Sequence, residues 1–240
     1  MSENKRINVL HLYPREMNIY GDWGNVLTLL KRLEWHGYDP QLLEHHPGEP
    51  FPHDVDLVIG GGGQDSGQGI VQVDLQKIAQ ELRALADDDT PMLMICGLYQ
   101  LFGHRFVTHQ NESIPGIGIF DLETIAGNNR MIGNVISSSP HGKLIGYENH
   151  SGATWLGKNQ KPLGKVLKGD GNNGQDSTEG AIYRSVFGSY LHGSLLPKNP
   201  QFADELIRLA TIRKFGSFEP RVIDDTFSDK ARAQSMKRPR

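Results

Sequence analysis

The chain contains a single cysteine, Cys96, which follows the apolar run "PMLMI" and precedes "GLYQLFG". The run predicts a buried strand, and the glycine after Cys96 allows a sharp turn into a helix. A cysteine on such a turn is lifted out of the sheet and faces helix N–H groups, which favour the thiolate and an exposed nucleophile. Free cysteine is also a common buried core residue. The stretch alone therefore leaves two interpretations, a core residue or a nucleophile.

A cysteine nucleophile needs a base, usually a histidine that is distant in the sequence and close in space. His192 follows the apolar run "VFGSYL" and precedes a glycine, which places it at a strand end. It lies beside Cys96 if both strands belong to one sheet. His150, in "GYENHSG", is the second candidate. The alternative for either residue is a hydrogen-bonded structural histidine. The histidines in polar stretches are predicted to be solvated, namely His45, His46, His53, His104 and His109.

Four consecutive glycines, residues 60–63, follow the predicted strand "DVDLVI". The loop lacks the Lys-Ser/Thr pair of a P-loop and does not form G-x-G-x-x-G, so ATP and dinucleotides are not expected there. It offers backbone N–H groups at the carboxyl end of a parallel strand, where ligands of α/β proteins bind. Such donors can stabilise an oxyanion. A plain tight turn is the alternative.

The segment "GDGNNGQDSTEG" has some features of a calcium loop. Gln175 stands where the invariant glycine belongs, and Ala181 where the bidentate glutamate belongs. We therefore predict a flexible turn and no metal site.

Strand and helix patterns alternate in the first half of the chain. Apolar residues recur at helical spacing after "NIYGDWGN", ending at Gly37, and again after Asp74, which is expected to cap the second helix. Buried strands separated by amphipathic helices predict a mainly parallel sheet covered on both faces. The second half is β-rich and punctuated by glycine, as in hairpins. A last helix begins near Pro200. We predict one α/β domain over residues 1–218 and a flexible tail over 219–240.

Composition describes an ordinary globular protein, with 37% hydrophobic residues and a net charge of −3 over 240 residues. This charge gives no electrostatic footprint for nucleic acid, and the basic end "KARAQSMKRPR" is better explained as a solvated terminus. No 18-residue apolar run or signal peptide is present, so no membrane span is expected. One cysteine cannot form an internal disulfide. A reducing cytoplasm is therefore the predicted location.

Several short motifs occur together in a specific order. They are "NIYGDWGN", "GGGQD", "ICGLYQLFG", "GNNRMIGN", "GYENHSG", "EGAIY" and "SYLHGSLLPKNP". In this order and spacing the chain resembles class I glutamine amidotransferases of the cobyric-acid-synthase type, and among them the amidotransferase subunits of lipid II isoglutaminyl synthases. The resemblance implies a three-layer, flavodoxin-like α/β fold.

The resemblance also implies catalytic roles. Cys96 would attack the carboxamide of glutamine, with His192 as base toward the thiol and acid toward departing ammonia. A γ-glutamyl thioester would form and be hydrolysed to glutamate. The backbone N–H groups of Gly62 and Gly97 would form the oxyanion hole. Gln100 would line the glutamine pocket and Arg130 would bind the α-carboxylate, which suits a guanidinium.

Two motifs differ from the family pattern. Met94 and Leu98 replace the glycines that often flank the nucleophile, and Ser194 stands where many class I enzymes carry an acid that orients the histidine. Serine cannot stabilise an imidazolium as a carboxylate does. The third catalytic acid would come from elsewhere in the chain, with Glu148 as one candidate, or from a partner subunit.

The resemblance implies a heterodimer in which this chain carries no cofactor. ATP would bind to a Mur-ligase-like synthase subunit of the MurT type, which amidates the α-carboxyl of D-glutamate in the lipid II stem peptide. Little glutaminase activity is expected without that partner. Three alternatives stay open: another carboxylate acceptor such as a corrin, a degenerate non-catalytic binding subunit, and a cysteine hydrolase acting on peptides or small amides.

Overall fold

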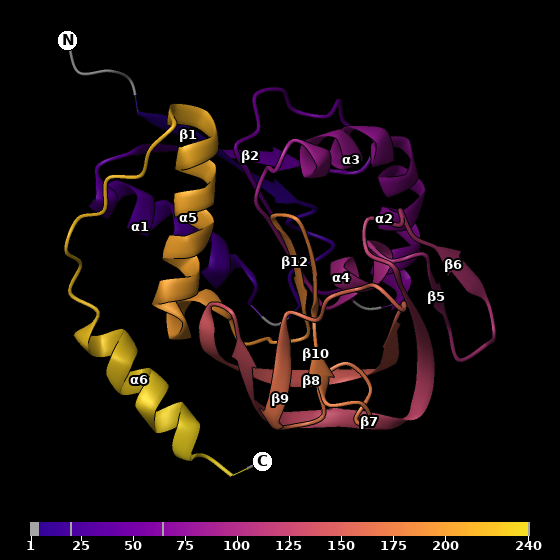
Figure 1. Cartoon of the computed structure of the whole chain (residues 1–240). Helices are drawn as coiled ribbons and strands as arrows, with labels where there is room; N and C mark the ends of the chain where they lie inside the picture. Colours follow the sequence, from indigo (N-terminus) through magenta and orange to yellow (C-terminus); the bar gives the residue numbers. More distant parts are fainter. Residues whose placement is uncertain (1–4, 20, 64, 240) are drawn as a thin grey trace.

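The computed structural model describes residues 5–19, 21–63 and 65–239 (Figure 1). Its first sheet has six strands in the order β11-β12-β4-β3-β1-β2. The neighbours from β2 to β12 pair in parallel, and β11 pairs with β12 in the antiparallel sense. The strands are β1 (Arg6–Leu12), β2 (Asp39–His45), β3 (Leu57–Gly60), β4 (Met92–Ile95), β11 (Ala181–Tyr183) and β12 (Val186–Ser189).

Three central strands bring the candidate residues to one edge of this sheet. Every residue of β3, β4 and β12 is buried, as expected for strands covered on both faces. Gly60 and Gly188 both lie opposite Met94 in the register. Because the three strands run in parallel, the glycine run, Cys96 and the segment leading to His192 all leave the sheet at the same edge.

Helices cover both faces of the sheet (Figure 1). They are α1 (Trp23–His36), α2 (Asp65–Lys77), α3 (Ala79–Asp87), α4 (Gly97–Leu101) and α5 (Pro200–Phe215). Helices α1 and α5 pack together, and α2 contacts α3. As predicted, α1 ends at Gly37, whose left-handed backbone (φ +87°) suits glycine.

Two sequence predictions in this half are wrong. Asp74 does not cap a helix, because it lies inside α2 and the chain breaks into α3 only at Ile78. Its carboxylate instead accepts hydrogen bonds from the Tyr13 hydroxyl (2.9 Å) and the Gly48 N–H (2.7 Å), and lies 2.9 Å from His45 Nε2. His45 is therefore fully buried rather than solvated. Tertiary partners, invisible in the local sequence, decide both positions.

The β-rich second half forms another sheet in the order β10-β9-β7-β5-β6, with β8 paired to β7. Its strands are β5 (Arg105–Val107), β6 (Ser113–Pro115), β7 (Leu122–Ser139), β8 (Gly142–Leu156), β9 (Gly164–Lys168) and β10 (Thr178–Glu179). The long hairpin of β7 and β8 reaches the first sheet through Tyr147. The backbone groups of Tyr147 and His192 exchange hydrogen bonds of 2.8 and 3.3 Å.

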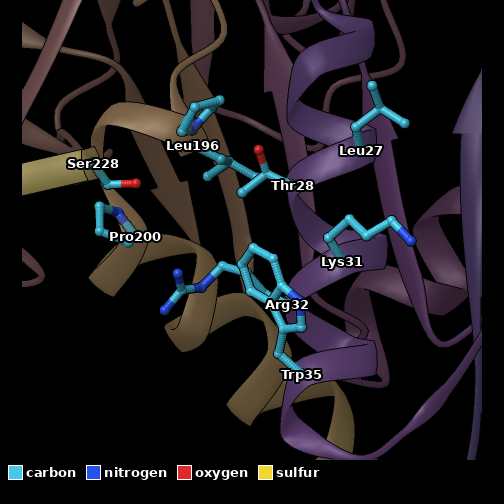
Figure 2. Close-up of a pocket in the computed structure, with 9 residues that line it drawn as sticks. Leu27, Thr28, Lys31, Arg32, Trp35, Leu196, Pro200 and Ser228 are labelled. Carbon is cyan, nitrogen blue, oxygen red and sulfur yellow. The ribbon is translucent and has the colours of Figure 1, made fainter. Parts of the chain in front are cut away.

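The end of the chain contains the short helix η1 (Leu196–Lys198) and the helix α6 (Thr226–Lys237), which runs along the outside of the molecule (Figure 1). The buried Arg32 of α1 holds this end, since its guanidinium binds Asp204 of α5 and Asp225 just before α6, each at 2.6 Å. Figure 2 shows the pocket beside Arg32, which Trp35 and Pro200 also line. The division at residue 218 stays a prediction.

None of the helices within the described ranges is long and apolar enough to cross a lipid bilayer.

Candidate active site

Cys96 occupies the turn between β4 and α4, as the sequence predicts. Its backbone has φ +51° and ψ −103°, a region that residues other than glycine rarely adopt. Such strain costs on the order of 1–3 kcal/mol and persists only where the surroundings impose it. Here the Cys96 N–H donates to Ser189 O and its carbonyl accepts from Gln100 N–H, both at 2.9 Å. The fold thus holds the thiol on a strained turn at the edge of the sheet.

Gly62 lies next to both candidate catalytic residues, Cys96 and His192. A Cβ atom placed on Gly62 would lie 3.1 Å from Cys96 Cβ and 3.1 Å from His192 Cε1. The backbone of Gly62 therefore lies beside both side chains, and a side chain at this position would crowd them. The structure brings together three residues that lie far apart in the sequence, as the prediction of a shared sheet edge requires.

His192 is buried and adjoins β8 through the backbone bonds to Tyr147. Burial, aided by the nearby His150, lowers the pKa of His192 to about 3. The ring is therefore neutral at physiological pH, which is the protonation state that a general base requires.

His150, the other candidate base, is held differently. Its ring stacks on Tyr190 with centroids 3.6 Å apart, and its Nδ1 lies 2.8 Å from Gly152 O. Burial lowers the pKa of His150 to about 4. These contacts fit a neutral ring on β8 that packs against the segment before His192.

The two residues expected to form the oxyanion hole have different surroundings. Gly97 directly follows Cys96 and begins α4. The N–H of Gly62 donates a 2.7 Å hydrogen bond to Asp22 Oδ2. Sequence reasoning did not single out Asp22, although it lies in the motif "NIYGDWGN" just before α1. Its position suggests a helix cap, yet its side chain makes no capping bond. The roles of Gly62 and Gly97 stay predictions.

The residues expected to bind glutamine lie on α4 and β7. Gln100 is buried, and its Nε2 donates to the Tyr190 hydroxyl at 3.0 Å. Arg130 lies beside the irregularity in the pairing of β7 with β8, and its Nε donates to Asn149 Oδ1 at 2.7 Å. Asn149 directly precedes His150, so Arg130 is close to the buried ring. Both substrate-binding roles stay predictions.

Two buried carboxylates, Glu148 and Glu179, accept hydrogen bonds from residues of neighbouring segments. Glu148 accepts the backbone N–H groups of Asp170 and Gly171 at 2.9 and 2.8 Å, which fixes the turn after β9. Its role as the third catalytic acid stays a prediction. Glu179 accepts bonds from Ser189 Oγ and the Tyr190 N–H, both at 2.9 Å, and burial raises its pKa to about 7. The motif "EGAIY" was the only sequence signal for Glu179.

No group of three or more His, Cys, Asp or Glu side chains that could hold a metal ion occurs in the described part of the chain.

Comparison with curated proteins finds relatives along nearly the whole chain. The chain is 36% identical to the lipid II isoglutaminyl synthase (glutamine-hydrolyzing) subunit GatD of Staphylococcus aureus, over 91% of its own length and 90% of the relative's. It is 37% identical to the GatD subunit of Streptococcus pneumoniae, over 88% of its own length and 83% of the relative's.

The fold is also similar to solved glutamine amidotransferases. One crystal structure of a glutamine amidotransferase superposes with a TM-score of 0.59 at 16% identity, covering 84% of this chain and 98% of that one. At this identity the likeness concerns the fold, and it confirms the predicted three-layer α/β architecture. The family model of the CobB/CobQ-like glutamine amidotransferase domain matches residues 8–200. The chain therefore belongs to the family of CobB/CobQ-like glutamine amidotransferase domains.

Proposed function

We propose that this chain is the glutaminase subunit of a lipid II isoglutaminyl synthase. It hydrolyses glutamine to glutamate and delivers ammonia to a separate ATP-dependent subunit, which amidates D-glutamate in the lipid II stem peptide. The observation that carries the proposal is the position of Cys96 on a strained turn, at a point where a Cβ added to Gly62 would touch both Cys96 and His192. Both GatD relatives are described as subunits, and this chain covers most of their length.

The reaction follows from this pair. His192 takes the proton of Cys96 as the sulfur attacks the carboxamide carbon of glutamine. The tetrahedral intermediate collapses, the C–N bond breaks, and His192 returns the proton to the leaving nitrogen, so that ammonia departs and a thioester remains. A water molecule then attacks the thioester while His192 accepts its proton. Glutamate leaves, and the proton returns to the thiolate.

The surrounding groups have supporting roles in this proposal. The N–H groups of Gly62 and Gly97 stabilise the oxyanion of each tetrahedral intermediate. Arg130 pairs with the α-carboxylate of glutamine, and Gln100 lines the pocket. The partner is a Mur-ligase-like synthase of the MurT type in a heterodimer. ATP binds to that partner, and this chain needs no cofactor of its own.

The proposal is tested by reconstituting the chain with a MurT-type synthase, ATP, lipid II and glutamine labelled with nitrogen-15 in the side-chain amide. Mass spectrometry should find the label in lipid II. Cys96→Ala and His192→Ala should lose transfer from glutamine but retain amidation from added ammonium salt, because the synthase site is intact. His104→Ala, at an exposed histidine that pairs with Asp121, is the matched control and should behave like the wild type.

Transfer that survives in Cys96→Ala would contradict the assigned nucleophile. Hydrolysis of glutamine without transfer to lipid II, even from ammonium salt, would retain the glutaminase and point to another acceptor carboxylate. An absence of glutamine hydrolysis in any reconstituted complex would favour a non-catalytic binding subunit.

A further inference from the structure

Asp22 is a carboxylate in an unusual environment. It is 2% exposed, and its Oδ2 accepts the N–H of Gly62 at 2.7 Å. Its Oδ1 is buried and has no hydrogen-bond partner within the described part of the chain. Buried carboxylates are normally paired with a cation or several donors, because desolvation of the charge is costly. One backbone N–H is thus the main support of this charge.

That single donor lies beside the reacting groups. Gly62 is the residue whose added Cβ would touch both Cys96 and His192. The carbonyl oxygen of Gly62 accepts the N–H of Ile19 at 3.1 Å. The loop before α1 therefore binds both backbone groups of Gly62, and it fixes the direction in which the N–H points.

The hydrogen bond to Asp22 and an oxyanion bond exclude one another. A backbone N–H makes one strong, nearly linear hydrogen bond, and bonds to a charged acceptor are the stronger ones. While Asp22 holds the N–H of Gly62, an oxyanion formed on the substrate lacks that donor. Burial raises the pKa of Asp22 to about 6, so the carboxylate is mostly ionised at pH 7.5.

We propose that Asp22 restrains the glutaminase by holding the N–H of Gly62 away from the reacting carbonyl, and that full activity requires its release. This inference rests on the proposed function, which assigns Gly62 to the oxyanion hole. It makes Asp22 a positioning residue that acts through Gly62. The neighbouring glycines permit the peptide group to rotate, because no side chain opposes positive φ. Ile19, which is 38% exposed, offers a docked synthase a contact through which to move the loop.

The test compares Asp22→Ala and Asp22→Asn with the wild type in the full-length chain without synthase. The kcat of glutamine hydrolysis should rise about tenfold in Asp22→Ala, which is the factor expected from losing one hydrogen bond to a charged group. Asp22→Asn should rise less, since a neutral amide oxygen still accepts. KM should stay unchanged. The alkylation rate of Cys96 by iodoacetamide should also stay unchanged, because that reaction does not use the oxyanion hole.

Asp56→Asn is the matched control. Asp56 is buried and likewise accepts a backbone N–H at 2.7 Å, from Asn8, but it precedes β3 at the opposite end of the sheet. Its kcat should equal that of the wild type. Hydrogen exchange of the Gly62 amide, followed by NMR, should accelerate only in the Asp22 variants.

An unchanged or lower kcat in both Asp22 variants, with unchanged alkylation, would overturn the inference and assign Asp22 to holding the loop in its productive form. If Asp22→Ala does not fold, Asp22→Asn decides alone, since it keeps the shape of the side chain. Failure of the proposed function looks different, because the wild type would then hydrolyse no glutamine even with the synthase, and both proposals would fall together.

Discussion

The hydroxyl of Ser194 donates a 2.7 Å hydrogen bond to the carbonyl oxygen of Gly21, and so ties the loop that follows His192 to the loop that precedes α1. Ser194 also lies close to the first turn of α1, since a Cβ on Gly24 would stand 2.2 Å from Ser194 Oγ. Ser194 stands where many class I amidotransferases carry an acid. In this chain it anchors the histidine loop to the same segment that holds the glycine run.

Replacement of Ser194 by alanine should lower the kcat of glutamine hydrolysis about fivefold with little change in KM. One neutral hydrogen bond contributes about 1 kcal/mol, and its loss frees the loop that positions His192. Ser139→Ala is the control, because Ser139 Oγ also donates to a backbone carbonyl at 2.8 Å, but on an exposed hairpin. Steady-state kinetics of glutamine hydrolysis measure kcat and KM for both variants. Equal kinetics for the two variants would show that the Ser194 bond does not matter for catalysis.

Gly62→Ala should reduce kcat by about 10- to 100-fold while the protein still folds. The added methyl group would stand 3.1 Å from Cys96 Cβ and His192 Cε1, and small displacements of reacting groups are costly. Gly69→Ala on α2 is the control, since nothing lies within 4 Å of its added Cβ. That variant should retain full activity and gain up to about 1 kcal/mol of stability. A fully active Gly62→Ala would contradict the close approach at this point.

Arg32→Ala should lower the free energy of unfolding by about 2–3 kcal/mol, because it leaves the carboxylates of Asp204 and Asp225 without their shared cation. Both carboxylates are partly exposed, so the loss falls below that of a fully buried pair. Arg184→Ala provides the comparison. Arg184 pairs with Asp89 in an exposed position, where solvent screens the charges, so its loss should cost much less than the loss of Arg32. Urea unfolding measures both, and equal losses would remove Arg32 from its role in holding the end of the chain.

Acid should destabilise the protein partly through His11, which is buried and stacks on Trp23. Burial, aided by the charge of His46, lowers the pKa of His11 to about 4. The unfolded chain therefore binds this proton more readily than the folded chain. The stabilising contribution is complete above about pH 6.5 and is lost as the pH falls toward 4.

His11→Phe should therefore flatten the dependence of the unfolding free energy on pH, by about 2–3 kcal/mol between pH 7 and pH 4.5. His109→Phe, at an exposed position, should leave the dependence as in the wild type. Urea unfolding series at several pH values measure the slopes. Parallel curves for His11→Phe and the wild type would exclude His11 as a source of acid sensitivity.

Local patterns predicted much of this fold. Continuous apolar runs gave the buried strands β3 and β4, and helical spacing ending at Gly37 gave α1. Both signals are local, because they depend on periodicity and on backbone freedom at one residue. The turn at Cys96 was predictable for the same reason. The meeting of Cys96 with His192 needed the further assumption of a shared sheet edge, which the parallel pairing of β4 with β12 confirms.

Residues whose roles depend on distant partners could not be predicted in this way. Asp22 resembles an ordinary helix cap until the glycine run, 40 positions away, is placed against it. His45 lies in a polar stretch and is buried only because Asp74 comes to meet it. The helix α6 has no buried residue and no apolar periodicity from which it could be predicted. Propensity describes a segment, whereas these features are properties of pairs of segments.

The single thiol allows the state of Cys96 to be measured directly with thiol reagents. Because Cys96 is the sole cysteine in the sequence, every equivalent of thiol reagent consumed by the pure protein counts one proposed catalytic centre. A fluorophore or isotopic tag attached through sulfur can be bound only at Cys96, and no other cysteines need to be replaced before such an experiment. Cys96 is 7% exposed, so two copies cannot readily join through a disulfide during storage, and oxidation of the thiol would have to come from small oxidants entering the site.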